Sequence, residues 1–157
     1  MHKLSFVRHA IRGDYMKTNK EILTSIVKTT QMGQTGIRSV MPYAETVDLK
    51  KALNSQKQEY DAIEQEAFSI AAARGWELKE LSPMSKLFSN ISAFGNLMIG
   101  NTESKIAAMM INGNTRGMIK GLKNTHHGEN SDHAINTLAQ KLLDCESENI
   151  RQMQGYV

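Results

Sequence analysis

The stretch from Thr102 to Asn124 constrains the fold of this chain more than any other part. On a helix with 100° between successive residues, its apolar residues and glycines cover well over half of the circumference and leave a narrow polar stripe. Gly113, Gly117 and Gly121 recur at every fourth position. Each glycine weakens an isolated helix by roughly 1 kcal/mol relative to alanine, so close approach of a neighbouring backbone is expected to offset the loss. The stretch therefore predicts the central helix of a bundle.

The remainder of the chain predicts three more long helices and one shorter helix. Each has an apolar face with helical spacing and a capping or stop signal at one end. Together they indicate an all-α, antiparallel four-helix bundle with one extra, shorter helix before the third long helix. The expected long helices run from about Asn19, itself the N-cap, to Met41 before Pro42, from about Thr46 to Arg74 before Gly75, and from a Ser131 cap to about Gln154, while the shorter helix follows Ser82-Pro83.

Length and charge narrow the class of protein. The chain of 157 residues fits one domain, and its 19 basic and 16 acidic side chains give a net charge of +3. Three basic residues and one acidic residue among the first fifteen supply +2 of that charge, so the remainder is nearly neutral. A nucleic-acid-binding protein would need a concentrated basic face. We expect residues 1–17 to be a disordered leader and residues 18–157 to be the single helical domain.

The cellular setting is inferred from cysteine usage and from hydropathy. One cysteine, Cys145, leaves no intramolecular disulfide to form. No apolar run reaches the roughly 18 residues of a membrane span, and no charged-then-apolar signal opens the chain. We therefore expect a cytoplasmic protein that binds neither a membrane nor nucleic acid.

Several polar side chains fall on the faces that the helices are expected to bury. Burying such groups without partners costs roughly 1–3 kcal/mol each, so they should pair with one another or form a site. Gln56 with Glu59, and Glu146 with Asn149, form two pairs at i, i+3 spacing on the second and last long helices. One interpretation is a polar layer that fixes helix register, in which Glu146 bonds to an inward glutamine or to Tyr60. The inward set consists of Thr30, Gln34, Gln56, Glu59, Tyr60, Asn114, Glu146 and Asn149.

Two segments carry a family resemblance. Residues 106–122, IAAMMINGNTRGMIKGL, and residues 139–156, AQKLLDCESENIRQMQGY, resemble the helices of uncharacterised bacterial ferritin-like four-helix-bundle proteins of unknown function. The resemblance to the ferritin-like superfamily covers nearly everything after Met16. It implies a bundle in which metal-binding members take one Glu from each of two helices and a Glu-x-x-His pair from each of the other two.

This chain departs from that metal-binding pattern, because neither of its i, i+3 pairs contains a histidine. Amides bring no charge to balance iron and are poor ligands for it. We therefore expect a non-catalytic bundle without a cofactor, with a structural or protein-interaction role, that forms a homo-oligomer or binds an unknown protein partner. The alternative is an iron or manganese protein with a degenerate site, in which Glu59 and Glu146 bind metal and Gln34, Gln56 and Asn149 are weak ligands or supporting residues.

Three smaller features carry chemistry of their own. Val7-Arg8-His9-Ala10 resembles the start of a histidine phosphatase of the phosphoglycerate-mutase type, but the strand-rich pattern that this fold needs does not follow. Cys145 lies between two acidic residues, without the cationic surroundings that activate a thiol, and is expected to be a core cysteine. The third is a group suited to adventitious Zn²⁺ or Ni²⁺ binding, made of His126, His127, Glu129, Asp132 and His133.

Overall fold

The computed structural model describes residues 17–80, 99–127 and 132–157, and within those ranges the chain is all-α. This confirms the expected fold class at the level of secondary structure. The leader and the shorter helix expected after Ser82-Pro83 lie outside the described residues. The described elements are α2 (Asn19–Val40), the 3₁₀ turn η1 (Met41–Tyr43), α3 (Val47–Ala73), α5 (Thr102–His127) and α6 (His133–Gln154).

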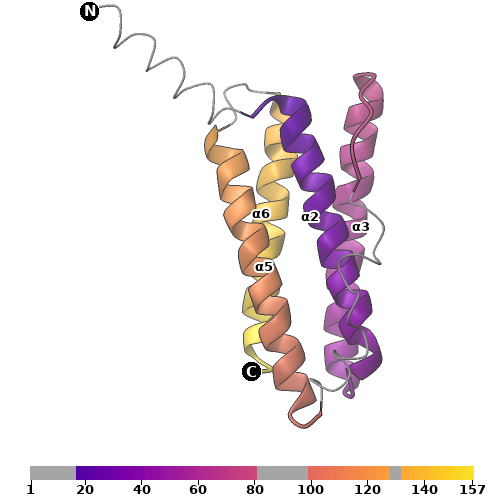
Figure 1. The fold of residues 1–157 in the computed structure, drawn as a ribbon, viewed down its shortest axis with the longest axis vertical. Helices are drawn as coiled ribbons and strands as arrows, with labels where there is room; N and C mark the ends of the chain where they lie inside the picture. Colours follow the sequence, from indigo (N-terminus) through magenta and orange to yellow (C-terminus); the bar gives the residue numbers. More distant parts are fainter. Residues whose placement is uncertain (1–16, 81–98, 128–131) are drawn as a thin grey trace, which may run out of the picture.

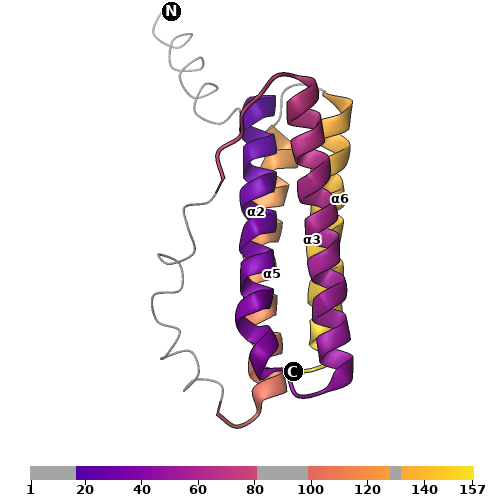
Figure 2. The ribbon, with the colours of Figure 1, turned by 90° about the vertical axis from the view of Figure 1, so that its right-hand side faces the viewer.

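The four long helices pack side by side as a bundle (Figures 1 and 2). α2 lies beside α3 and α5, and α6 lies beside the same two helices. Each of these neighbouring pairs is antiparallel, whereas α3 and α5 run in the same direction. The chain between α3 and α5 therefore joins opposite ends of the bundle. Within the described ranges, no helix combines the length and apolar character that crossing a membrane requires.

Helix α2 is capped one residue earlier than the sequence analysis predicted. Thr18, with extended backbone, accepts a hydrogen bond from the Glu21 backbone N–H at 3.1 Å, and the Glu21 carboxylate accepts one from the Thr18 N–H at 3.0 Å. This reciprocal capping box satisfies two backbone donors, whereas Asn19 is already helical. The spacing Thr-x-x-Glu was visible in the sequence, and the prediction of Asn19 as the cap was wrong.

The ends of α5 and α6 also differ from the prediction. Asp132, not Ser131, caps α6, and its side chain accepts from the Ile135 backbone N–H. Helix α5 continues to His127, three residues past Asn124, where the predicted stretch ended. Asp132 is better placed to cap because its carboxylate also suits the positive end of the helix dipole.

Gly75 ends α3 as predicted. It has φ of +67°, a left-handed conformation that glycine adopts without steric cost. The Trp76 N–H donates to the Ala71 carbonyl at 2.9 Å and the Gly75 N–H to the Ala72 carbonyl at 3.1 Å. These two bonds form a Schellman motif, which satisfies the last carbonyls of the helix.

Helix α5 is one of four equivalent helices and not the central helix that its apolar coverage suggested. Its buried apolar side is narrow, with Ile106 and Ala107 inaccessible, while Ile119 is 51% exposed and Leu122 is 40% exposed. The core is instead shared among all four helices. Much of the uncharged surface of α5 therefore faces away from the core.

Candidate functional site

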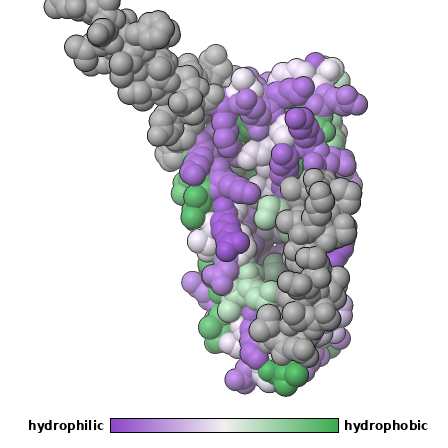
Figure 3. Space-filling view, viewed as in Figure 1, coloured by the Kyte–Doolittle hydropathy of each residue, from purple (hydrophilic) through white to green (hydrophobic). Residues whose placement is uncertain are grey.

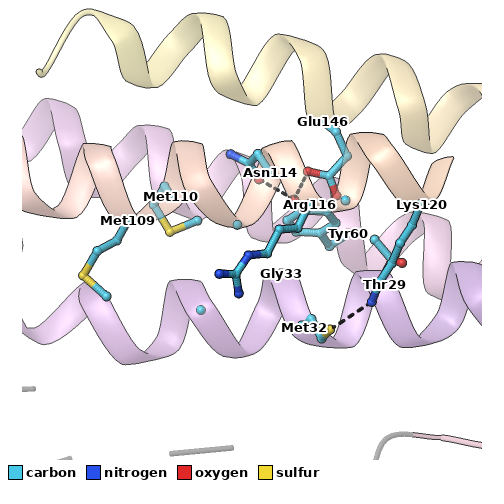
Figure 4. Close-up of a pocket in the computed structure, with 13 residues that line it drawn as sticks. Thr29, Met32, Gly33, Tyr60, Met109, Met110, Asn114, Arg116, Lys120 and Glu146 are labelled. Atoms are coloured by element: carbon cyan, nitrogen blue, oxygen red, sulfur yellow. Dashed lines mark hydrogen bonds between the residues drawn. The ribbon is translucent and has the colours of Figure 1, made fainter. Parts of the chain in front are cut away.

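Tyr60 stands at the centre of the polar cluster and is 1% exposed. Its ring packs on Gly33 of α2, where an added Cβ would lie 2.4 Å from a ring carbon. Its hydroxyl oxygen lies 2.9 Å from Asn114 Oδ1 on α5 and 3.0 Å from Glu146 Oε2 on α6. The Asn149 amide nitrogen lies 3.4 Å away as a donor. One side chain from α3 therefore contacts all three of the other helices (Figure 4).

The number of protons on Tyr60 and Glu146 determines which hydrogen bonds this cluster can form. A phenol has one proton to donate and can accept two hydrogen bonds, yet Tyr60 faces two acceptor oxygens. Both contacts of the Tyr60 hydroxyl can be hydrogen bonds when Glu146 is protonated, because its O–H then donates to Tyr60 while Tyr60 donates to Asn114 Oδ1. Burial raises the pKa of Glu146 to about 8, against the smaller opposing effect of the Tyr60 hydrogen bond. Glu146 is therefore mostly neutral at pH 7.

The hydrogen bonding predicted for the polar layer is present for one pair of residues, and its role in fixing helix register stays a prediction. Glu146 bonds to Tyr60, one of the partners predicted for it. Gln56 bonds instead to Gln152 at 2.7 Å, a residue outside the predicted inward set, and the Gln56 carbonyl oxygen is buried without a partner. Thr30 donates to the backbone carbonyl of Val27, within its own helix.

Cys145 forms a second contact between α3 and α6. Its Sγ donates to Glu59 Oε2 at 3.2 Å, and the side chain is 8% exposed. Burial, and then the hydrogen bond to the Glu59 carboxylate and its charge, raise the pKa of the Cys145 thiol well above its usual range. A protonated thiol is a poor nucleophile, so Cys145 has the properties of the core cysteine that we expected.

The residues predicted for the alternative metal site lie in separate contacts. Glu59 is exposed and accepts from Cys145, whereas Glu146 is 2% exposed and bonds to Tyr60. Asn149 donates towards both Tyr60 and the Cys145 sulfur, and Gln34 is buried on α2. Among the described side chains, no three His, Cys, Asp or Glu residues converge as metal ligands. Metal binding by Glu59 and Glu146 stays a prediction.

The histidine-rich group is described only in part. His133 is exposed at the start of α6, while Asp132 caps that helix and accepts from Arg74 Nε at 2.7 Å. The pair of Arg74 and Asp132 joins the end of α3 to the start of α6 and was not predicted from the sequence. The side chains of His126, His127 and Glu129 lie outside the described residues, as do Arg8 and His9.

A cavity of about 130 Å³ lies beside the polar cluster, between α2 and α5 (Figure 4). Tyr60, Asn114 and Glu146 form its polar inner side. Arg116 and Lys120 extend from α5 across its mouth, and Lys120 Nζ lies 3.7 Å from Met32 Sδ on α2. The other lining residues are mainly methionines and glycines: Met109, Met110, Gly33, Gly36, Gly113, Gly117 and Thr29.

The glycines around this cavity have different roles. A Cβ on Gly117 would lie 2.5 Å from Glu146 Oε1, and one on Gly121 would lie 3.2 Å from Leu143 Cδ1. Close approach is thus found at these two positions, where the nearest atoms belong to α6 side chains and not to the backbone that was predicted, whereas the prediction for Gly113 was wrong. Nothing lies within 4 Å of a Cβ built on Gly36 or Gly113. These two glycines leave the cavity open, and the sequence analysis missed it.

Alanine substitutions are expected to separate these two kinds of glycine. Gly33→Ala and Gly117→Ala should each lower the free energy of unfolding by about 1–3 kcal/mol, because the new methyl group meets the Tyr60 ring or the Glu146 carboxyl group. Gly36→Ala and Gly113→Ala, each on the same helix as its counterpart, should raise it by up to about 1 kcal/mol through helix propensity. Urea unfolding measures all four. Equal stability of Gly33→Ala and Gly36→Ala would contradict the packing described.

Comparison with protein-family models, curated proteins and solved structures found no match for this chain. Kinship with the ferritin-like superfamily therefore stays a prediction that rests on the two segments quoted above.

Proposed function

We propose that this chain is a non-catalytic, ferritin-like bundle with a structural or protein-interaction role, and that its first partner is a second copy of itself. The observation that carries the proposal is an uncharged stripe on α5, with Ile119 51% exposed and Leu122 40% exposed. We define the α5 stripe as Ala108, Ile111, Thr115, Met118, Ile119 and Leu122.

The spacing of the stripe suits helix pairing. Ala108, Ile111, Thr115, Met118 and Leu122 follow one another at alternating intervals of three and four residues. This is the interval of a coiled-coil seam, which buries its residues against a second helix. Figure 3 has hydrophobic patches along the α5 edge of the face that it draws. Covering a stripe of this kind with another chain removes apolar surface from water, which favours association.

The non-catalytic part of the proposal is supported by the state of the buried reactive groups. With Glu146 protonated, Glu146 donates to Tyr60 and Tyr60 donates to Asn114, so both protons are used within the cluster. Cys145 keeps its proton because burial and Glu59 both disfavour the thiolate.

Sedimentation velocity at micromolar concentration tests the self-association. The unmodified protein should sediment as a dimer or larger assembly, and Ile119→Lys should shift it to monomer because a charge would be buried in the contact. Ser55→Lys, at an exposed position of α3, is the matched control and should leave the assembly unchanged. A monomer at every concentration, or equal effects of the two lysines, would overturn the proposal.

A further inference from the structure

We propose that the cavity between α2 and α5 binds a small organic anion, a monocarboxylate with a compact aromatic or branched aliphatic body. The carboxylate would lie at the mouth with Arg116 and Lys120, and the apolar body would extend inward along Met32, Met109 and Met110. This site is independent of self-association, because it lies between α2 and α5 and none of its lining residues belongs to the α5 stripe.

The size of the cavity sets the size of the ligand. Its volume of about 130 Å³ is close to that of an engineered apolar cavity of about 150 Å³ that holds benzene. Three methionines supply flexible, polarizable walls that adapt to a ring or a branched chain. The cavity therefore suits a body about as large as one six-membered ring.

The charge at the mouth selects an anion. Among the described residues, neither Arg116 nor Lys120 has a carboxylate partner within ion-pair distance. Lys120 instead contacts the Met32 sulfur across the opening. A guanidinium group binds a carboxylate through two parallel hydrogen bonds, and the ammonium group adds a second charge. A ligand carboxylate at the mouth would thus give Arg116 the partner that it lacks, and the charge of Lys120 on the same opening would add to the attraction.

The inner side of the cavity does not repel such a ligand. Glu146 is the one acidic residue among those that line it, and because burial raises its pKa to about 8 it is mostly protonated at pH 7. The groups facing Glu146 are the Tyr60 hydroxyl from α3 and Gly117 of α5, with Asn149 on its own helix also bonded to Tyr60. The amide nitrogen of Asn114 is buried without a partner. A hydroxyl or carbonyl oxygen on the inner end of the ligand would suit this polar side.

Isothermal titration calorimetry with benzoate at pH 7 tests the proposal, with benzyl alcohol as the uncharged probe of similar size. We expect saturable binding of one benzoate per chain, with a dissociation constant in the millimolar range or tighter, and weaker binding of benzyl alcohol. Arg116→Gln should weaken benzoate binding by about tenfold or more, because it removes a charge-assisted hydrogen bond. Lys123→Gln is the control, an exposed cation of α5 that does not line the cavity.

A second variant tests the position of the ligand. Gly113→Leu fills open space, so the protein should stay folded by circular dichroism and lose benzoate binding. Absence of saturable benzoate binding to the unmodified protein would overturn the proposal. So would binding that survives Gly113→Leu, or binding that Lys123→Gln weakens as much as Arg116→Gln does. These outcomes are independent of the sedimentation result, which tests the α5 stripe.

Discussion

Replacing Glu146 by glutamine should raise the free energy of unfolding at pH 7 and remove most of its dependence on pH between about 5 and 8. The pKa of Glu146 rises from 4.5 to about 8 because the carboxyl group is buried. Between these values the native protein holds a proton that the unfolded chain has released, so stability falls as the pH rises. The stabilising contribution is complete below the unfolded pKa and is lost as the pH passes the folded one.

The expected size of this effect is large for one side chain. A shift of this size lowers the free energy of unfolding by a few kcal/mol as the pH rises past both pKa values. A glutamine has the shape of Glu146 but does not ionise, so the variant does not lose this stability. The glutamine N–H can donate to the Tyr60 oxygen in place of the carboxyl proton. We therefore expect the free energy of unfolding of Glu146→Gln to exceed that of the unmodified protein by a few kcal/mol at pH 8.5 and by less at pH 5.

Urea unfolding of both proteins at pH 5, 7 and 8.5 measures this difference. Glu148→Gln is the control, since Glu148 is exposed on the same helix and pairs with Arg151. The carboxylates of Glu103 and Asp132 have lowered pKa values, with hydrogen bonds outweighing their desolvation, so their contributions are lost only at lower pH. An unmodified protein whose stability is flat from pH 5 to 8 would show that Glu146 is ionised in the fold.

The helices could be predicted from the sequence because their signals are local. Apolar residues at intervals of three and four place the helices, and Pro42 and Gly75 mark two of the ends. Two of the errors fall at the caps, where Thr18 and Asp132 compete with their polar neighbours for one position. That competition depends on which backbone torsions the chain adopts, and periodicity carries no information about it.

The site could be predicted only as a set of residues. Tyr60, Asn114, Glu146 and Asn149 all fall on inward faces, but the Tyr60 contacts span 54 and 86 residues along the chain. Which of these groups meet depends on how the helices are rotated and shifted relative to one another. The cavity was not predictable for the same reason, because Gly113 and Gly117 look alike in sequence and only Gly117 faces a side chain.

Removing the Tyr60 hydroxyl should have the opposite effect to changing Glu146. Tyr60→Phe keeps the ring on Gly33 but leaves Asn114 Oδ1, the Glu146 carboxyl group and the Asn149 amide without their shared partner. Each buried polar group left unpaired costs about 1–3 kcal/mol, so we expect a loss of about 3 kcal/mol or more in the free energy of unfolding. Tyr156→Phe, at a half-buried tyrosine near the end of the chain, is the control and should change it little.

The double variant Tyr60→Phe/Glu146→Gln distinguishes a bonded network from simple packing. If the hydroxyl and the carboxyl group stabilise one another, the two changes will not add, and the double-mutant cycle will give a coupling energy of about 1 kcal/mol or more. When Glu146 is ionised, the Tyr60 hydroxyl donates to its carboxylate and so opposes the rise caused by burial, and without that bond the pKa of Glu146 should move still higher. The decline in stability with rising pH should therefore continue to a higher pH in Tyr60→Phe than in the unmodified protein. Additive changes and an unmoved pH dependence would mean that Tyr60 holds the four helices through its ring alone.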